Sequence, residues 1–169
     1  MNKLDDLLKP GHPLPADEVM IAKALEILNF SPHGQQLVNF AAKEKIEIRI
    51  MPTPQPQTYL PDTRKAYIGF NRAHPISPSH FVLLLTAVLR EAQQEYSGIK
   101  HPPLHAPRDE HIKIGMAKRE DAMWYMCTAA VELDDQEIFT EYKFIDELRK
   151  MGHNETVDLY LKQERGQGR

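Results

Sequence analysis

The stretch Ser77-Pro-Ser-His-Phe-Val-Leu-Leu-Leu-Thr-Ala-Val-Leu-Arg-Glu-Ala-Gln-Gln-Glu-Tyr-Ser97 decides the fold. Ser77 is suited to cap a helix and Pro78 to its first turn, and nothing before Gly98 interrupts the helical pattern. The residues from Phe81 to Leu89 are apolar nearly all round the helix, which is unfavourable in water, whereas the second half of the stretch is polar. We therefore predict a long central helix that begins inside the core and emerges from it.

The chain before this helix changes its hydrophobic period twice. Apolar residues recur at helical spacing in residues 17–29 and again in residues 32–45. Alternation of apolar and polar residues then predicts strands at 46–51 and 65–71. Four prolines in and around residues 53–63 predict a long loop between the two strands.

The chain after the central helix contains few further signals. Residues 100–114 are predicted to form a loop that is too long to be a minimal connector. Helical patterning resumes at about Lys118, with a stripe of small or flexible side chains suited to close contact with another helix. The apolar pattern of residues 135–162 predicts further helices, and residues 163–169 are expected to form a mobile tail.

The length and hydrophobic content of the chain predict a single domain over residues 1–169, with a flexible N-terminal segment at residues 1–15. Hydrophobic residues make up 41% of the chain, enough for a real core, and the fold class is a mainly helical α+β domain with a two- or three-stranded sheet. The net charge of -3 includes no basic block, so we expect neither nucleic acid nor membrane as a partner. The longest apolar run is about half a bilayer span, and no secretory signal is visible.

Cys127 is the single cysteine of the chain. It excludes an internal disulfide and a zinc site of several thiolates, and it agrees with a cytoplasmic location. Because Met123, Trp124 and Met126 surround it on a helical pattern, we expect a small buried apolar residue rather than a catalytic thiol.

The order of these elements resembles the minimal core of zincin-like metallopeptidases across residues 31–134, and more narrowly small bacterial domains of that type without established function. In that family the long helix carries His-Glu-x-x-His, usually followed by x-x-Gln, and the next helix opens with a segment like Glu-Ala-Asp-Ala. Histidines four residues apart can share one zinc ion, and the glutamate between them polarises the bound water.

The motif of the long helix is degenerate in this chain. Ala87 and Glu91 stand where the family has its two histidines, Val88 stands where it has the glutamate, and Gln94 matches. Neither alanine nor valine binds zinc or moves a proton. The resemblance therefore implies the fold without the chemistry, and we expect Ala87 and Val88 to be buried and Glu91 to mark the edge of the core.

The downstream segment matches the family in part. Asp121 and Ala122 match, whereas Arg119 stands at the position of the third ligand unless the register shifts by one residue to Glu120. If the two helices pack as in that family, Glu91, Glu95, Glu120 and Asp121 come together near Arg90 or Arg119. Such a cluster could be an acid–base pair, but a salt-bridged polar plug in a vacated active site is the simpler interpretation.

Three histidines offer a separate candidate metal site. His101, His105 and His111 lie within eleven residues, together with two carboxylates. None of them forms a pair at the one-turn spacing of a helical site, so a surface loop is the alternative interpretation. We therefore expect no cofactor, zinc included.

These observations leave several functions open. The first is a non-catalytic binding or regulatory module for a protein or peptide, in which an extended peptide adds to the edge of the second strand. The second is a hydrolase with a site rebuilt from Glu91, Glu120, Asp121 and a histidine of residues 101–111. A structural partner subunit is the third.

Overall fold

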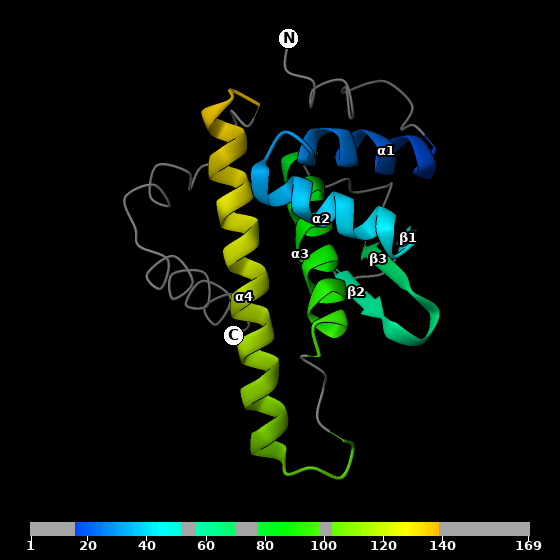
Figure 1. Cartoon of the computed structure of the whole chain (residues 1–169), viewed down its shortest axis with the longest axis vertical. Coiled ribbons are helices and arrows are strands. Elements are labelled where there is room, and N and C mark those ends of the chain that lie inside the picture. The colour runs from blue at the N-terminus through cyan, green and yellow to red at the C-terminus, as the bar shows by residue number, and fades with distance from the viewer. Residues whose placement is uncertain (1–15, 52–56, 70–77, 99–102, 139–169) are drawn as a thin grey trace.

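The computed structural model describes residues 16–51, 57–69, 78–98 and 103–138 (Figure 1). Within these ranges the chain is a mainly helical α+β structure with one small sheet, as predicted. The elements are α1 (Asp17–Leu28), α2 (Pro32–Lys43), β1 (Glu47–Met51), β2 (Gln57–Leu60), the 3-10 turn η1 (Pro61–Thr63), β3 (Lys65–Gly69), α3 (Pro78–Tyr96) and α4 (Arg108–Asp135). The N-terminal segment 1–15, the helices predicted beyond residue 138 and the C-terminal tail lie outside the described residues.

The sheet has three strands in the order β1-β3-β2, with β1 parallel and β2 antiparallel to β3. Strand β2 and turn η1 lie in residues 53–63, so the prediction of a continuous loop there was wrong. The reason is that the prolines flank residues 57–60 instead of interrupting them, and an outer strand needs hydrogen-bond partners on one side only. Because β3 is the central strand, the predicted open edge of the second strand is occupied by β2.

Helix α3 lies at the centre of the fold, between the sheet and α4 (Figure 1). It packs against β2 and β3 on one side, against α4 on another, and against α1 and α2. Every residue from Phe81 to Leu89 is buried, which confirms the interpretation of this run as a helix surrounded by core. Neighbouring elements supply the other large core side chains, among them Met20, Leu37, Ile68 and Leu133.

Helix α4 begins at Arg108, well before the predicted start near Lys118, and the predicted loop of residues 100–114 is correspondingly shorter. Asp109 and Glu110 in its first turn favour a helix start electrostatically. These early turns carry no apolar stripe toward the core because they extend beyond the other described elements (Figure 1). We call residues 108–117 the α4 arm.

A tight corner joins α1 to α2. The Ser31 hydroxyl caps α2 by accepting a hydrogen bond from the Gly34 amide at 3.0 Å, and Pro32 follows at the first helical position, as the sequence predicted. Gly34 lies so close to α1 that a Cβ atom there would approach the Leu28 carbonyl oxygen to 2.3 Å. The corner therefore requires glycine at this position.

No helix among the described residues has both the length and the apolar character needed to cross a membrane.

Candidate functional site

The two positions of α3 that the resemblance aligns with a zinc ligand and a general base of zincin-like metallopeptidases lie inside the core. Ala87 is 1% exposed and Val88 is fully buried, and both belong to the central hydrophobic cluster. The prediction of their burial is confirmed. Glu91 is half-buried, one turn beyond Ala87, where the apolar run gives way to polar residues. Helix α3 therefore presents close-packed apolar side chains at the two positions where a peptidase needs a water-filled cleft.

The polar half of α3 meets α4 in a network of paired charges, which we call the α3–α4 polar cluster. The Gln94 amide nitrogen donates to Asp121 Oδ2 at 2.7 Å and to the Lys118 carbonyl oxygen at 2.9 Å. Arg90 donates to both oxygens of Asp121, at 2.6 and 3.2 Å. The Lys118 ammonium group pairs with Glu95 at 2.5 Å. Each of these two carboxylates thus faces a cation.

The cluster includes two of the positions that match the zincin-like pattern. Gln94 is 1% exposed, and its contact with Asp121 joins the matched position of α3 to the matched position of α4. Arg119 is exposed and Glu120 is half-buried, and neither takes part in the Arg90–Asp121 and Lys118–Glu95 pairs. The α3–α4 polar cluster is a network of salt bridges, and Lys118 is a member of it that the sequence did not indicate.

Arg90 also connects this cluster to an aromatic group on α4. Its guanidinium carbon lies 4.2 Å from the centre of the Tyr125 ring, a cation–π arrangement, and one of its nitrogens donates to the Gln93 side chain. The Tyr125 and Trp124 rings meet edge-on at 5.1 Å between ring centroids. These contacts hold the guanidinium group between Asp121, Gln93 and the Tyr125 ring.

A second polar group ties the start of α2 to the far end of α4, and we call it the Ser31–His33–Glu132 clamp. Glu132 Oε2 accepts hydrogen bonds from the Ser31 hydroxyl at 2.5 Å and from the His33 amide at 3.1 Å. Glu132 Oε1 pairs with His33 Nδ1. Neither His33 nor Glu132 could be picked out from the sequence, because they lie 99 residues apart and only the Ser31-Pro32 cap marks this region.

The clamp resembles part of an acid–base site but lacks its decisive contact. A carboxylate at Nδ1 orients an imidazole and leaves Nε2 for proton transfer, as in catalytic triads. Here, however, the Ser31 hydroxyl donates to Glu132 and not to the imidazole, so His33 does not activate Ser31. The His33 ring also lies edge-on to Trp124 and Tyr125, at 5.2 and 5.7 Å between ring centroids. These contacts hold the start of α2 against α4.

The histidine-rich segment does not converge on the α3–α4 polar cluster. His105 is exposed. His111 lies in the first turns of α4, and a rise of about 1.5 Å per residue places it about 15 Å from Asp121 along the helix axis. His101 lies outside the described residues. Within the part of the chain that the structure describes, no three His, Cys, Asp or Glu side chains are grouped closely enough to hold a metal ion.

Cys127 is buried on α4. Burial raises the pKa of its thiol to about 12, so the thiolate that a nucleophile requires does not form near neutral pH. The expectation that Cys127 is buried is confirmed.

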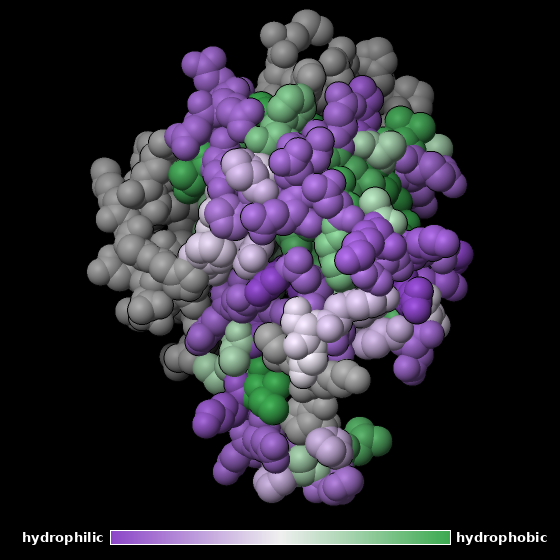
Figure 2. All heavy atoms as spheres, in the orientation of Figure 1, coloured by the Kyte–Doolittle hydropathy of each residue, from purple (hydrophilic) through white to green (hydrophobic). Residues whose placement is uncertain are grey.

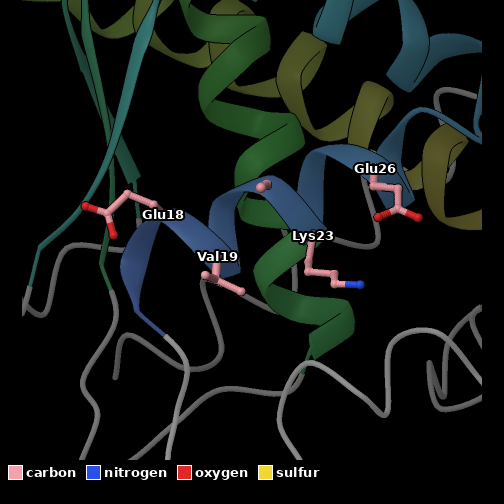
Figure 3. A pocket seen from close by; sticks show the side chains of 5 residues that line it. Glu18, Val19, Lys23 and Glu26 are labelled. Atoms are coloured by element: carbon pink, nitrogen blue, oxygen red, sulfur yellow. The ribbon is translucent and has the colours of Figure 1, made fainter.

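A surface hollow of about 270 Å³ lies along α1 (Figure 3). Among the described residues its lining comes from α1 alone: Glu18, Val19, Ala22, Lys23 and Glu26. The labelled side chains project from this one helix and mix both signs of charge beside Val19. This lining provides neither a nucleophile beside a base nor an apolar enclosure for a ligand.

The two outer strands of the sheet differ in character. On β1, Glu47 and Arg49 are exposed and pair with each other. Charged side chains on an outer strand discourage pairing with another chain. On β2, neither Tyr59 nor Leu60 is charged. Tyr59 packs against the core, and Leu60 is 43% exposed.

Aromatic residues lie beside β2. Tyr96, at the end of α3, is 41% exposed, and its ring meets that of Phe40 of α2 edge-on at 5.2 Å between ring centroids. Burial raises the pKa of the Tyr59 hydroxyl, and the neighbouring Tyr96 raises it further.

The chain matches no family model, no curated protein and no solved structure. The fold and the site define a mainly helical α+β domain whose central helix is sealed at its start and charge-paired at its end.

Proposed function

We propose that this chain is a non-catalytic domain of the zincin-like plan and acts as a binding or regulatory module. The observation that carries the proposal is the complete burial of Ala87 and Val88 on α3. Support also comes from the α3–α4 polar cluster, in which Asp121 and Glu95 already have cationic partners. A metallopeptidase would instead need free ligands around an open position for water.

The partner that suits the structure is an extended peptide added to the outer edge of β2. Strand addition uses the main-chain groups of an outer strand for affinity and nearby side-chain pockets for specificity. Strand β2 lacks the paired charges that Glu47 and Arg49 place on β1, and the exposed Tyr96 and Leu60 offer apolar contact beside it. Tyrosine is well suited to such surfaces because it combines a large apolar area with a hydroxyl.

Metal analysis tests the loss of catalysis. Purified protein should contain no stoichiometric zinc, and added zinc should leave its melting temperature unchanged. The triple variant Ala87→His, Val88→Glu, Glu91→His should lose stability without gaining zinc-dependent peptide cleavage. One tightly held zinc ion per wild-type chain would overturn the proposal.

Peptide selection tests the binding mode. Peptides selected from a random library should lose binding when alternate backbone amides are N-methylated, because one edge of the peptide must pair with β2. Leu60→Lys should weaken the selected peptides, whereas the control Glu47→Lys on β1 should not. Equal losses in both variants, or indifference to N-methylation, would argue against strand addition at β2.

A further inference from the structure

The α4 arm exposes an apolar pair on its surface. Ile112 is 48% exposed and Met116 is 39% exposed, one helical turn apart, and Leu104 just before the helix is fully exposed. In Figure 2 the lower part of the molecule, which holds the arm in Figure 1, shows hydrophobic residues set among hydrophilic ones. Two exposed apolar side chains are too small a patch to indicate a contact by themselves, so the charges around them carry the argument.

The charges around this pair follow a self-complementary order. Reading along the helix, Arg108 and Asp109 precede the apolar pair and Arg119 and Glu120 follow it. At about 100° per residue, these four side chains and Met116 all lie within about 80° of Ile112 around the helix axis. Residues 108–120, the α4 arm and the three residues that follow it, therefore have one face with an apolar centre and a basic–acidic pair at each end.

We propose that this face binds the same face of a second copy of the chain, with the two arms antiparallel. If the pair is centred on residue 114, Ile112 of each copy faces Met116 of the other. Asp109 then faces Arg119, and Arg108 faces Glu120. A two-fold axis requires a surface that complements itself, and this one supplies both the apolar contact and opposite charges at each end.

Two features of the arm make the pairing sterically feasible. A Cβ atom built on Gly115 would meet nothing within 4 Å, so the helices can approach closely beside the centre of the pair. The arm also extends beyond the other described elements, and an antiparallel partner places its own body past the tip of the arm (Figure 1). The overlap of residues 108–120 is about 20 Å long, which indicates a small interface and a weak, concentration-dependent dimer.

Sedimentation velocity over a range of protein concentrations tests the contact. The wild-type chain should shift from monomer to dimer as concentration rises, and Ile112→Asp should weaken dimerisation at least about tenfold, since the two-fold axis repeats the change. Ala117→Asp is the matched control, because Ala117 is exposed on the same arm but lies about 140° from Ile112. Equal weakening by both variants would refute the assigned face.

A charge exchange tests the orientation. Arg108→Glu and Glu120→Arg should each weaken dimerisation, because each brings like charges together at both ends of the interface. The double variant should recover wild-type dimerisation, with circular dichroism confirming that all variants are folded. A wild-type chain that stays monomeric at every concentration, or a double variant no better than the single ones, would overturn the proposal.

Discussion

Replacing Val88 by glutamate tests whether α3 is sealed at the position that the resemblance to zincin-like metallopeptidases aligns with a general base. Val88 is fully buried among apolar neighbours, so the new carboxyl group would have to stay protonated in the folded protein. Keeping it neutral at pH 7 costs about 4 kcal/mol, at about 1.36 kcal/mol for each pH unit above an ordinary pKa of about 4.3. Burial of an unmatched polar group adds about 1–3 kcal/mol. The total of about 5–7 kcal/mol is comparable with the whole stability of many domains.

The pH dependence separates the charge from the change of shape. The variant's folded-state pKa is raised above its unfolded value, so the ionisation penalty is absent below about pH 4.3 and grows as pH rises toward the folded pKa. Val88→Gln is the control, because it buries a polar group of similar size that does not titrate. Urea unfolding followed by Trp124 fluorescence should show the two variants diverging by up to about 4 kcal/mol between pH 4.5 and 7. If both were equally stable at pH 7 and close to wild type, water would reach Val88 and the sealed-core argument would fail.

Three further predictions concern stability and reactivity. Because burial raises the pKa of Cys127 to about 12, iodoacetamide should modify this thiol at pH 8 only after the protein unfolds. The stability that the neutral thiol contributes is complete below about pH 8.5, the pKa in the unfolded chain, and is lost as pH rises toward 12. Labelling of the native protein at the rate of a free thiol would contradict this. Glu132→Ala should lower the free energy of unfolding by about 2–4 kcal/mol, because Ser31 and His33 lose their hydrogen-bond acceptor. Glu132→Gln should lower it less. A loss below about 0.5 kcal/mol for Glu132→Ala in urea unfolding would show that the clamp contributes little to stability. Gly34→Ala should destabilise the folded protein by about 2 kcal/mol or more, because the new methyl group would clash with Leu28. Gly115→Ala, which has open space around it, should stabilise the folded protein by about 0.5–1 kcal/mol in the same thermal melts. Equal changes in the two variants would contradict the close approach of α1 and α2.

The helices and two of the strands could be predicted because each depends on a local pattern. Ser31-Pro32 marks the start of α2, and the apolar run from Phe81 to Leu89, followed by a polar stretch without Gly or Pro, is typical of a helix that starts inside the core. The short strand β2 could not be predicted in this way. Its four residues, Gln57–Leu60, show no clear alternation, and the strand exists through hydrogen bonds to β3, which lies beyond a turn. The early turns of α4 were missed for a related reason, since the arm has no core to face.

The sequence by itself determined that Ala87 and Val88 cannot act as a zinc ligand and a base, and that they would be buried. It also brought Gln94 and Asp121 to attention as matching positions. Only the tertiary structure decided that Asp121 pairs with Arg90, that Glu95 pairs with Lys118, and that Glu132 reaches Ser31 and His33. The physical reason is that hydrophobic periodicity is fixed within a few turns of one helix. The charges that meet depend on the rotation and axial register of α4 against α2 and α3, which the packing of the whole core sets.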